Sequence, residues 1–229
     1  MSVLILGDGL LGSELHRQTG WSVSSRKLKN LPTLDNSKDI LNLVKDYNIV
    51  VNCIAHTDSY SDDKEQHLNI NFKFVKILSD LCNQNGIKLV HISTEFVYAR
   101  NFNLPSEEDL PLPDSTWYAY TKLLADEYIK VSNSNFLICR ELHKPKPFNY
   151  PEVWRVRTSG DTVDKISKII VKLIENNARG VFNVGTGTKF LKTLNPEAIE
   201  IDPPSYVPLD TTMNINKLKK FYEEHNIHS

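Results

Sequence analysis

The sequence has few cysteines, almost no net charge and no long apolar run. Its three cysteines, Cys53, Cys82 and Cys139, are far apart and lie in apolar surroundings. We therefore expect small buried thiols in a reducing compartment and no disulfide framework. Because no C-x-x-C or H-E-x-x-H pattern occurs, we expect no metal site. A formal net charge of -1 predicts no nucleic-acid partner.

The sequence also shows no membrane-spanning segment and no secretory signal. No apolar stretch is long enough to span a bilayer. Residues 1–6 are too short and too uncharged for a secretory signal and are typical of a strand that starts at once. We expect a cytoplasmic protein with no membrane partner. With 40% hydrophobic and 24% charged residues over 229 positions, the composition is that of a globular protein.

Buried-type strands alternate with helical stripes through the first 140 residues. Strands are predicted at 3–6, 21–24, 49–54, 88–92 and 135–139, and helices at 10–17, 37–47, 69–83 and 117–130. Ser37 is the expected cap of the second helix. The alternation predicts an α/β fold with a Rossmann-type, doubly wound parallel sheet. The polar, proline-rich segment 93–115 is expected to be loop.

The last third of the chain has a different pattern. An irregular link is expected at 144–150, a helix at 161–176, a strand at 181–184, a loop at 203–208 and a final helix at 214–225. We therefore divide the chain into a nucleotide-binding Rossmann domain, 1–142, and a small C-terminal lobe with a closing strand and helices, 143–229. The two parts are expected to intertwine in one compact unit.

A glycine-rich loop follows the first predicted strand. Gly7-Asp-Gly9-Leu-Leu-Gly12 is a G-x-G-x-x-G that opens a helix, which is the context of a dinucleotide-binding turn. Gly7 permits the tight turn, Gly9 lets the backbone approach a pyrophosphate, and Gly12 lets the helix pack on the strand. We predict that Gly7, Gly9, Leu10, Leu11 and Gly12 bind the cofactor at the helix N-terminus. A glycine-rich turn without a ligand is the alternative.

The end of the second strand indicates which nicotinamide cofactor is used. An acidic residue there favours NAD, but the sequence has Ser24-Ser25-Arg26-Lys27 instead. The hydroxyl of Ser25 and the guanidinium of Arg26 suit a ribose 2′-phosphate, so NADP (as NADPH) is predicted, with NAD as the second choice. The alternative is a solvated basic loop.

A catalytic arrangement is predicted from Tyr118-Ala-Tyr-Thr-Lys122, a Y-x-x-x-K that places Tyr118 and Lys122 on one helix face. We expect the ammonium of Lys122 to lower the pKa of Tyr118 and to bind the nicotinamide ribose. Tyr120 has no lysine four residues on. Thr94 ends a predicted strand and can hold a substrate carbonyl oxygen together with Tyr118. A turn-capping role is the alternative for Thr94.

These motifs resemble the extended short-chain dehydrogenase/reductase superfamily, and in particular the dTDP-4-dehydrorhamnose reductase family. The resemblance is carried by Val51-Asn-Cys-Ile-Ala-His-Thr57, Ile70-Asn71, His91-Ile-Ser-Thr-Glu-Phe-Val-Tyr98, Glu107-Glu-Asp-Leu-Pro-Leu-Pro113, Tyr118-Ala-Tyr-Thr-Lys-Leu-Leu-Ala-Asp-Glu127 and Gly180-Val-Phe-Asn-Val-Gly185. It covers most of the first 140 residues and then thins.

The resemblance implies an enzyme of deoxysugar or polysaccharide biosynthesis. The implied reaction is NADPH-dependent reduction of the C4 ketone of a nucleotide-linked 4-keto-6-deoxy sugar. Thr94, Tyr118 and Lys122 are the implied catalytic triad. Ala55, His56 and Thr57 are implied to line the cofactor, and Thr94, Glu95, Phe96 and His143 the substrate.

The chain departs from the family pattern at three points. Its glycine loop is one residue tighter than the G-x-x-G-x-x-G of extended members, and we expect cofactor binding to survive this change. Glu95 replaces an aspartate. After Arg140 the substrate-side insertion is short, and His143 stands where the family has a tryptophan; a surface role is the alternative for His143.

Other functions and an assembly remain open on the same scaffold. The shortened lobe favours a non-catalytic, NADP-binding regulatory subunit as the main alternative. An epimerase or dehydratase ranks below reduction, because Thr94-Glu95-Phe96 matches the dehydratase acidic pair only in part. The helix that carries Tyr118 could also form a homodimer interface, although its apolar residues are explained equally well as core.

Overall fold

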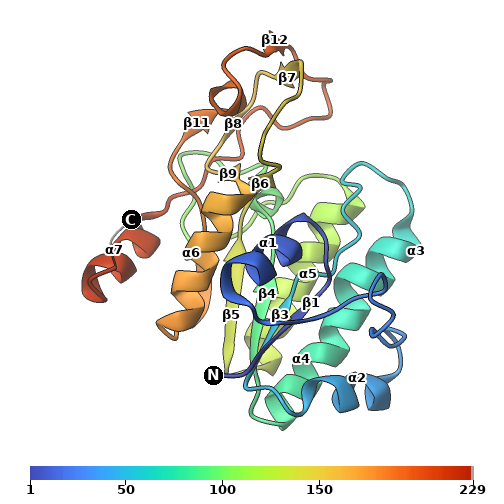
Figure 1. The fold of residues 1–229 in the computed structure, drawn as a ribbon. Helices are drawn as coiled ribbons and strands as arrows, with labels where there is room; N and C mark the ends of the chain where they lie inside the picture. Colours follow the sequence, from blue (N-terminus) through green and yellow to red (C-terminus); the bar gives the residue numbers. More distant parts are fainter. Residues whose placement is uncertain (228–229) are drawn as a thin grey trace.

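The central sheet of the computed structural model, which describes residues 1–227, contains six parallel strands (Figure 1). Their order across the sheet is β2-β1-β3-β4-β5-β10. The bounds are β1 Val3–Leu6, β2 Ser22–Ser24, β3 Ile49–Asn52, β4 Lys88–Ile92, β5 Phe136–Arg140 and β10 Gly180–Asn183. Strands β1, β3 and β4 are buried throughout their length, as expected when helices cover both faces of a parallel sheet. The predicted Rossmann-type fold is confirmed.

The strand order reverses at β1, which pairs with β2 on one side and with β3 on the other. In open α/β sheets this reversal leaves a crevice at the carboxyl ends of the strands, where ligands bind. The loop after β1 and the segment after β3 both open into this crevice.

Helices cover both faces of the sheet (Figure 1). One face carries α1 (Leu10–Thr19), α6 (Val163–Glu175) and α7 (Asn216–Glu224), whose apolar side chains share a core cluster with β1 and β5. The other face carries α2 (Ser37–Val44), α4 (Phe74–Gln84) and α5 (Trp117–Ser132). Helix α4 continues α3 (Lys64–Gln66) through a π-helical segment, η1 (His67–Lys73), that packs against α5.

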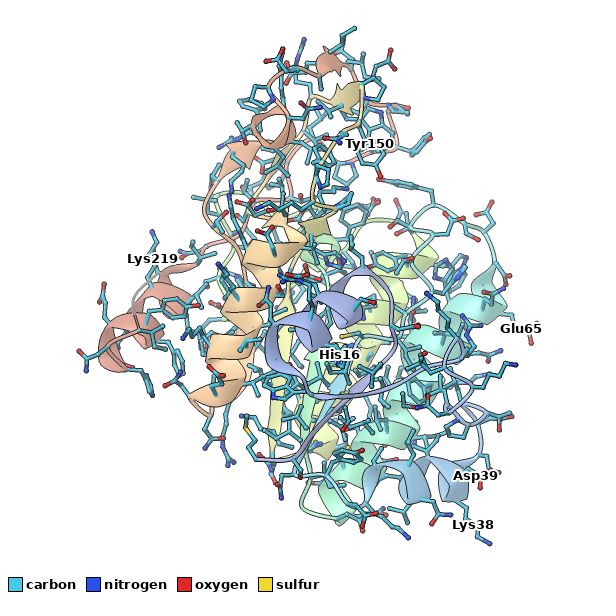
Figure 2. The ribbon with its side chains drawn as sticks, in the orientation of Figure 1. His16, Lys38, Asp39, Glu65, Tyr150 and Lys219 are labelled. Carbon is cyan, nitrogen blue, oxygen red and sulfur yellow. The ribbon has the colours of Figure 1, made fainter. Side chains whose placement is uncertain are left out.

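Short paired strands form the lobe at one end of the sheet, drawn at the top of Figure 1. The pairs are β6 (His143–Lys144) with β9 (Asp161–Thr162), β7 (Glu152–Trp154) with β12 (Ile199–Ile201), and β8 (Arg157–Thr158) with β11 (Lys189–Phe190). A short 3-10 helix, η3 (Leu191–Leu194), follows β11. In Figure 2, Tyr150 marks this lobe, and Lys38 and Asp39 on α2 mark the opposite end of the molecule. Because β10 joins the main sheet, the last third of the chain belongs to both parts.

Several predicted boundaries are wrong. The helix expected at 69–83 begins at Lys64, because the Asp63 side chain accepts a hydrogen bond from Gln66 N at 3.0 Å and caps it. Asn36, rather than Ser37, caps α2 through Asp39 N at 3.2 Å. The helix expected from 161 starts at Val163, since Asp161 and Thr162 pair with β6. The expected loop 93–115 contains a 3-10 turn, η2 (Glu95–Tyr98).

The cysteines are free thiols, with Cys82 and Cys139 buried and Cys53 half-buried. Burial raises the pKa of Cys53 and of Cys82 to about 12, so neither is a thiolate at neutral pH. No helix within residues 1–227 has both the length and the apolar character needed to cross a membrane.

Candidate active site

The glycine loop connects β1 to α1 and leaves open space over its middle residue. Gly7 makes the turn with a φ of +97°, a backbone angle that residues with a side chain rarely adopt. A Cβ on Gly12 would lie 2.0 Å from Gly7 O, so the helix can approach the loop only because residue 12 has no side chain. A Cβ on Gly9 would meet nothing within 4 Å. Gly9 caps α1 without a side chain, so the first N–H groups of the helix lack an intrahelical partner.

Ser25 and Arg26 follow β2 at the same edge of the sheet. Ser25 is buried, and its Oγ accepts a hydrogen bond from Leu28 N at 3.1 Å, which holds the turn after the strand. Arg26 is exposed, and both residues line the same cavity as the glycine loop. The guanidinium therefore stands at the rim of the space that the loop opens.

The segment after β3 is fixed by an asparagine from η1. Asn71 Oδ1 accepts from His56 N at 2.8 Å, and Asn71 Nδ2 donates to His56 O at 3.1 Å. Ala55 and Thr57 line the cavity, but His56 does not. The His56 ring packs edge-on against the His67 ring, with centroids 4.4 Å apart. The structure thus brings together all the predicted site residues except His56, and it adds Asn71 as the residue that positions this backbone.

Thr94 and Tyr118 meet at the carboxyl end of β4. Thr94 is buried and caps η2 through Phe96 N at 3.2 Å, as the turn-capping alternative expects. Its hydroxyl also lies close enough to Tyr118 to lower the pKa of that phenol, against the larger effect of burial. The Phe96 ring lies edge-on to the Tyr118 ring, with centroids 6.1 Å apart. Thr116 caps α5 two residues before Tyr118, through Ala119 N at 3.2 Å.

The expectation that Lys122 lowers the pKa of Tyr118 is wrong. Burial raises the pKa of Tyr118 to about 12, and the nearby carboxylates of Glu141 and Glu95 act in the same direction. Lys122 Nζ donates instead to Ile92 O at 2.5 Å and lies 3.3 Å from His91 Nε2. Tyr118 is consequently a protonated phenol at neutral pH.

Two residues that the sequence pattern did not predict for the site support Lys122. His91 contacts Lys122 directly, and Asn52 contacts His91. His91 and Asn52 are register partners on β4 and β3, and His91 Nδ1 lies 3.2 Å from Asn52 Nδ2. Burial, together with the charge of Lys122, holds the pKa of His91 well below its ordinary value, so the imidazole is neutral. Burial also lowers the pKa of Lys122 to about 8. The lysine therefore titrates close to physiological pH.

A buried ion pair also connects α5 to the neighbouring strand β5. Asp126 pairs with Arg140 Nε at 3.0 Å and accepts from Ser93 Oγ at 2.9 Å, and Arg140 also donates to the Tyr98 hydroxyl. Both charged side chains are essentially inaccessible. A buried pair of this kind is costly to break from one side, so it fixes α5 relative to β4 and β5.

The lobe contributes a second set of buried polar groups. Glu95 is 1% exposed, and its carboxylate accepts from the hydroxyls of Thr158, at 2.8 Å, and of Thr211. Burial raises its pKa to about 7. Glu141, after β5, accepts from His143 Nδ1 at 3.0 Å. Thr158, Thr211 and Glu141 are further residues that the sequence pattern did not single out.

One cavity of about 720 Å³ joins these groups. It extends from the glycine loop, past Thr94, Tyr118 and Lys122, to the lobe. Trp154, Val156, Leu191 and Val207 line its lobe side. No three His, Cys, Asp or Glu side chains among residues 1–227 are placed to hold a metal ion.

Solved structures with the same fold cover almost the whole chain. A dTDP-4-dehydrorhamnose reductase from Bacillus anthracis in complex with NADP aligns with a TM-score of 0.81 and 19% identity, over 96% of this chain and 92% of that one. A dTDP-4-dehydrorhamnose reductase from Clostridium acetobutylicum gives 0.79 and 20%, over 97% and 93%. The UDP-glucuronic acid 4-epimerase from Bacillus cereus in complex with NAD gives 0.75 and 19%, over 96% and 92%.

At these identities the structural similarity establishes the fold, and it continues beyond residue 140, where the sequence resemblance thins. No curated protein sequence matches the chain significantly. The family model described as the RmlD substrate binding domain matches residues 1–142, more than half of the chain. The chain therefore belongs to the RmlD substrate binding domain family.

Proposed function

We propose that this chain is an NADPH-dependent reductase of the C4 ketone of a nucleotide-linked 4-keto-6-deoxy sugar. The observation that carries the proposal is the single cavity that joins the glycine loop to Thr94, Tyr118 and Lys122. Membership of the family and the named relatives support the same chemistry.

The cofactor end of the cavity fits a dinucleotide phosphate. The open space over Gly9 and the unpartnered N–H groups of α1 suit a pyrophosphate. Arg26 at the rim suits a 2′-phosphate, as in NADP. Ala55 and Thr57 line the space between the loop and Tyr118. When bound, the nicotinamide supplies the hydride for reduction.

The residues around the ketone supply a proton and exclude water. The Tyr118 and Thr94 hydroxyls both donate to the carbonyl oxygen, and Tyr118 transfers its proton there as the oxygen gains charge. A pKa of about 12 keeps Tyr118 protonated and ready to act as an acid. Lys122 lines the same cavity, and one of its N–H groups is available to the ribose. Phe96 and the apolar lobe side chains keep the site dry.

The test is NADPH oxidation by the purified protein against a panel of dTDP-, UDP- and GDP-linked 4-keto-6-deoxy sugars. Turnover of one member of the panel identifies the substrate and supports the proposal. If NADPH binds tightly but no sugar is turned over, the reductase proposal fails, and a cofactor-binding regulatory subunit becomes the better explanation. A protein purified with tightly retained oxidised cofactor would indicate an epimerase or dehydratase instead.

A further inference from the structure

The lobe side of the cavity contains a carboxylate–imidazole pair that ketone reduction does not use. Glu141 follows β5 and His143 begins β6. Both carboxylate oxygens of Glu141 lie 3.0 Å from His143 Nδ1. The Glu141 side chain is 4% exposed and the His143 side chain 26% exposed. Both residues line the cavity, and the imidazole is the more exposed of the two side chains.

The pairing determines which nitrogen of His143 is basic. Because Nδ1–H donates to Glu141, the neutral ring carries its lone pair on Nε2. Burial works against a charged imidazole, but the carboxylate of Glu141 outweighs it and raises the pKa of His143 above its ordinary value. Lys144, the neighbouring cation, acts in the opposite direction. His143 is thus an oriented base, in the arrangement in which a carboxylate holds and polarises a histidine.

The pair lies close to the groups that would hold the ketone. Glu95 N donates to Glu141 O at 3.2 Å, which places the ends of β4 and β5 side by side. The charge of Glu141 is near enough to Tyr118 to raise the pKa of that phenol. Glu141, His143 and Lys144 line the same cavity as Tyr118 and Thr94, so a sugar whose carbonyl oxygen contacts Tyr118 and Thr94 shares that cavity with the pair.

We propose that the Glu141–His143 pair removes and returns a proton at a carbon next to the ketone of the bound 4-keto sugar. This second activity rests on the proposed function for its substrate class. His143 Nε2 takes the proton as the C–H bond breaks, and the electron pair forms a carbon–carbon double bond. The carbonyl oxygen receives a proton from Tyr118, so the intermediate is an enol. The reverse steps return a proton to carbon and restore the ketone, with no oxidant or reductant consumed.

The physical basis is the polarised carbonyl. A C–H bond beside a ketone is a weak acid, and hydrogen bonds from Tyr118 and Thr94 stabilise the negative charge that develops on oxygen. A positioned general base contributes about 10²- to 10⁴-fold to such a proton transfer. The cavity brings both elements together, a polarising pair at the oxygen and an oriented base on the lobe side.

The experiment measures solvent exchange in the absence of a hydride donor. The full-length protein, loaded with NADP⁺, is incubated in D₂O with a dTDP-linked 4-keto-6-deoxy sugar, and deuterium at C3 and C5 is followed by NMR against a protein-free control. The wild type should exchange one of these positions well above that background. His143→Gln should slow the enzymatic exchange by about 100-fold. His225→Gln, at the exposed residue that follows α7, is the matched control and should exchange like the wild type.

Reduction with NADPH is measured on the same variants. In His143→Gln the reduction kcat should fall by no more than about a tenth of the factor by which exchange falls, because His143 does not supply the proton to the carbonyl. Glu141→Gln keeps the shape of the pair but removes its charge, so it should slow exchange by about tenfold and serves if His143→Gln is poorly folded.

The outcomes separate the two proposals. Reduction by the wild type without exchange above background overturns the second activity alone. Exchange that is equal in the wild type and in both variants also overturns it. Exchange that depends on His143, without any reduction, supports the second activity and contradicts the proposed reductase. Loss of both activities in the wild type contradicts both.

Discussion

The cofactor end of the cavity is formed by backbone, whereas the lobe end is formed by buried charged side chains. At the first end, Gly9 leaves open space and Gly12 allows a helix to approach a loop. At the second, Glu95 accepts hydrogen bonds from Thr158 and Thr211, and Glu141 accepts one from His143. Adding a Cβ to the backbone site should weaken folding or cofactor binding. At the side-chain site, a change in protonation should alter stability. The two ends can therefore be perturbed independently.

The largest effect is expected when the backbone site loses its glycines. Gly12→Ala places a Cβ 2.0 Å from the Gly7 carbonyl oxygen, and neither backbone segment can move without distorting β1 or α1. We expect a loss in free energy of unfolding on the order of 4 kcal/mol or more, measured by urea denaturation. Gly9→Ala meets no protein atom, so it should fold normally yet bind NADPH at least about tenfold more weakly. Equal stability of the two variants would contradict this account of the loop.

This difference also explains what could be predicted from the sequence. The glycine loop is a local motif within six residues of chain, so Gly7, Gly9 and Gly12 could be assigned from their spacing. Glu95 is held by Thr211, 116 residues away in the sequence, and no local pattern indicates that contact. His91 and Asn52 meet only through the register of β3 with β4.

The behaviour of Tyr118 shows why spacing alone was insufficient at the catalytic residues. The Y-x-x-x-K motif correctly places Lys122 on the same helix. The pKa of Tyr118 depends on burial and on acidic side chains from the segments that follow β4 and β5, which are set by tertiary packing. The alternation of strands and helices predicted the fold because each element carries its own periodicity. Helix ends were misplaced where single side chains, such as Asp63, cap them.

The lobe end should make the stability of the protein depend on pH, and Glu95→Gln tests this. Burial raises the folded pKa of Glu95 to about 7, so its stabilising contribution is fully present below its unfolded pKa and is lost as pH rises through 7. The neutral amide avoids that loss. Between pH 5 and pH 8 the wild type should lose up to about 3 kcal/mol of stability relative to the variant. Thermal denaturation at both pH values measures the difference.

Glu108→Gln is the control for that experiment, because Glu108 is an exposed glutamate in the loop between η2 and α5. Its stability should follow the wild type at both pH values. A Glu95→Gln variant whose stability runs parallel to the wild type from pH 5 to pH 8 would show that Glu95 is not a destabilising buried charge.

The smallest expected effect concerns cofactor choice at the rim of the backbone site. If Arg26 binds the 2′-phosphate, Arg26→Ala should weaken NADPH about tenfold or more, the size of one charge-assisted contact, and NADH by less than about threefold. Lys27→Ala is the matched control, since Lys27 is an exposed neighbouring cation that does not line the cavity. Fluorescence titration with both cofactors gives the ratio, and equal losses for NADPH and NADH would contradict the predicted preference.

The central claim is that Tyr118 donates the proton in a ketone reduction, and the most direct test compares two tyrosines on one helix. Tyr118→Phe and Tyr120→Phe each remove one hydroxyl, but Tyr120 is 47% exposed and does not line the cavity. Single-turnover NADPH oxidation with the sugar identified from the panel is measured for both. Tyr118→Phe should slow the reaction by about 10²- to 10⁴-fold with NADPH binding retained, and Tyr120→Phe should match the wild type. Wild-type turnover in Tyr118→Phe would contradict the account.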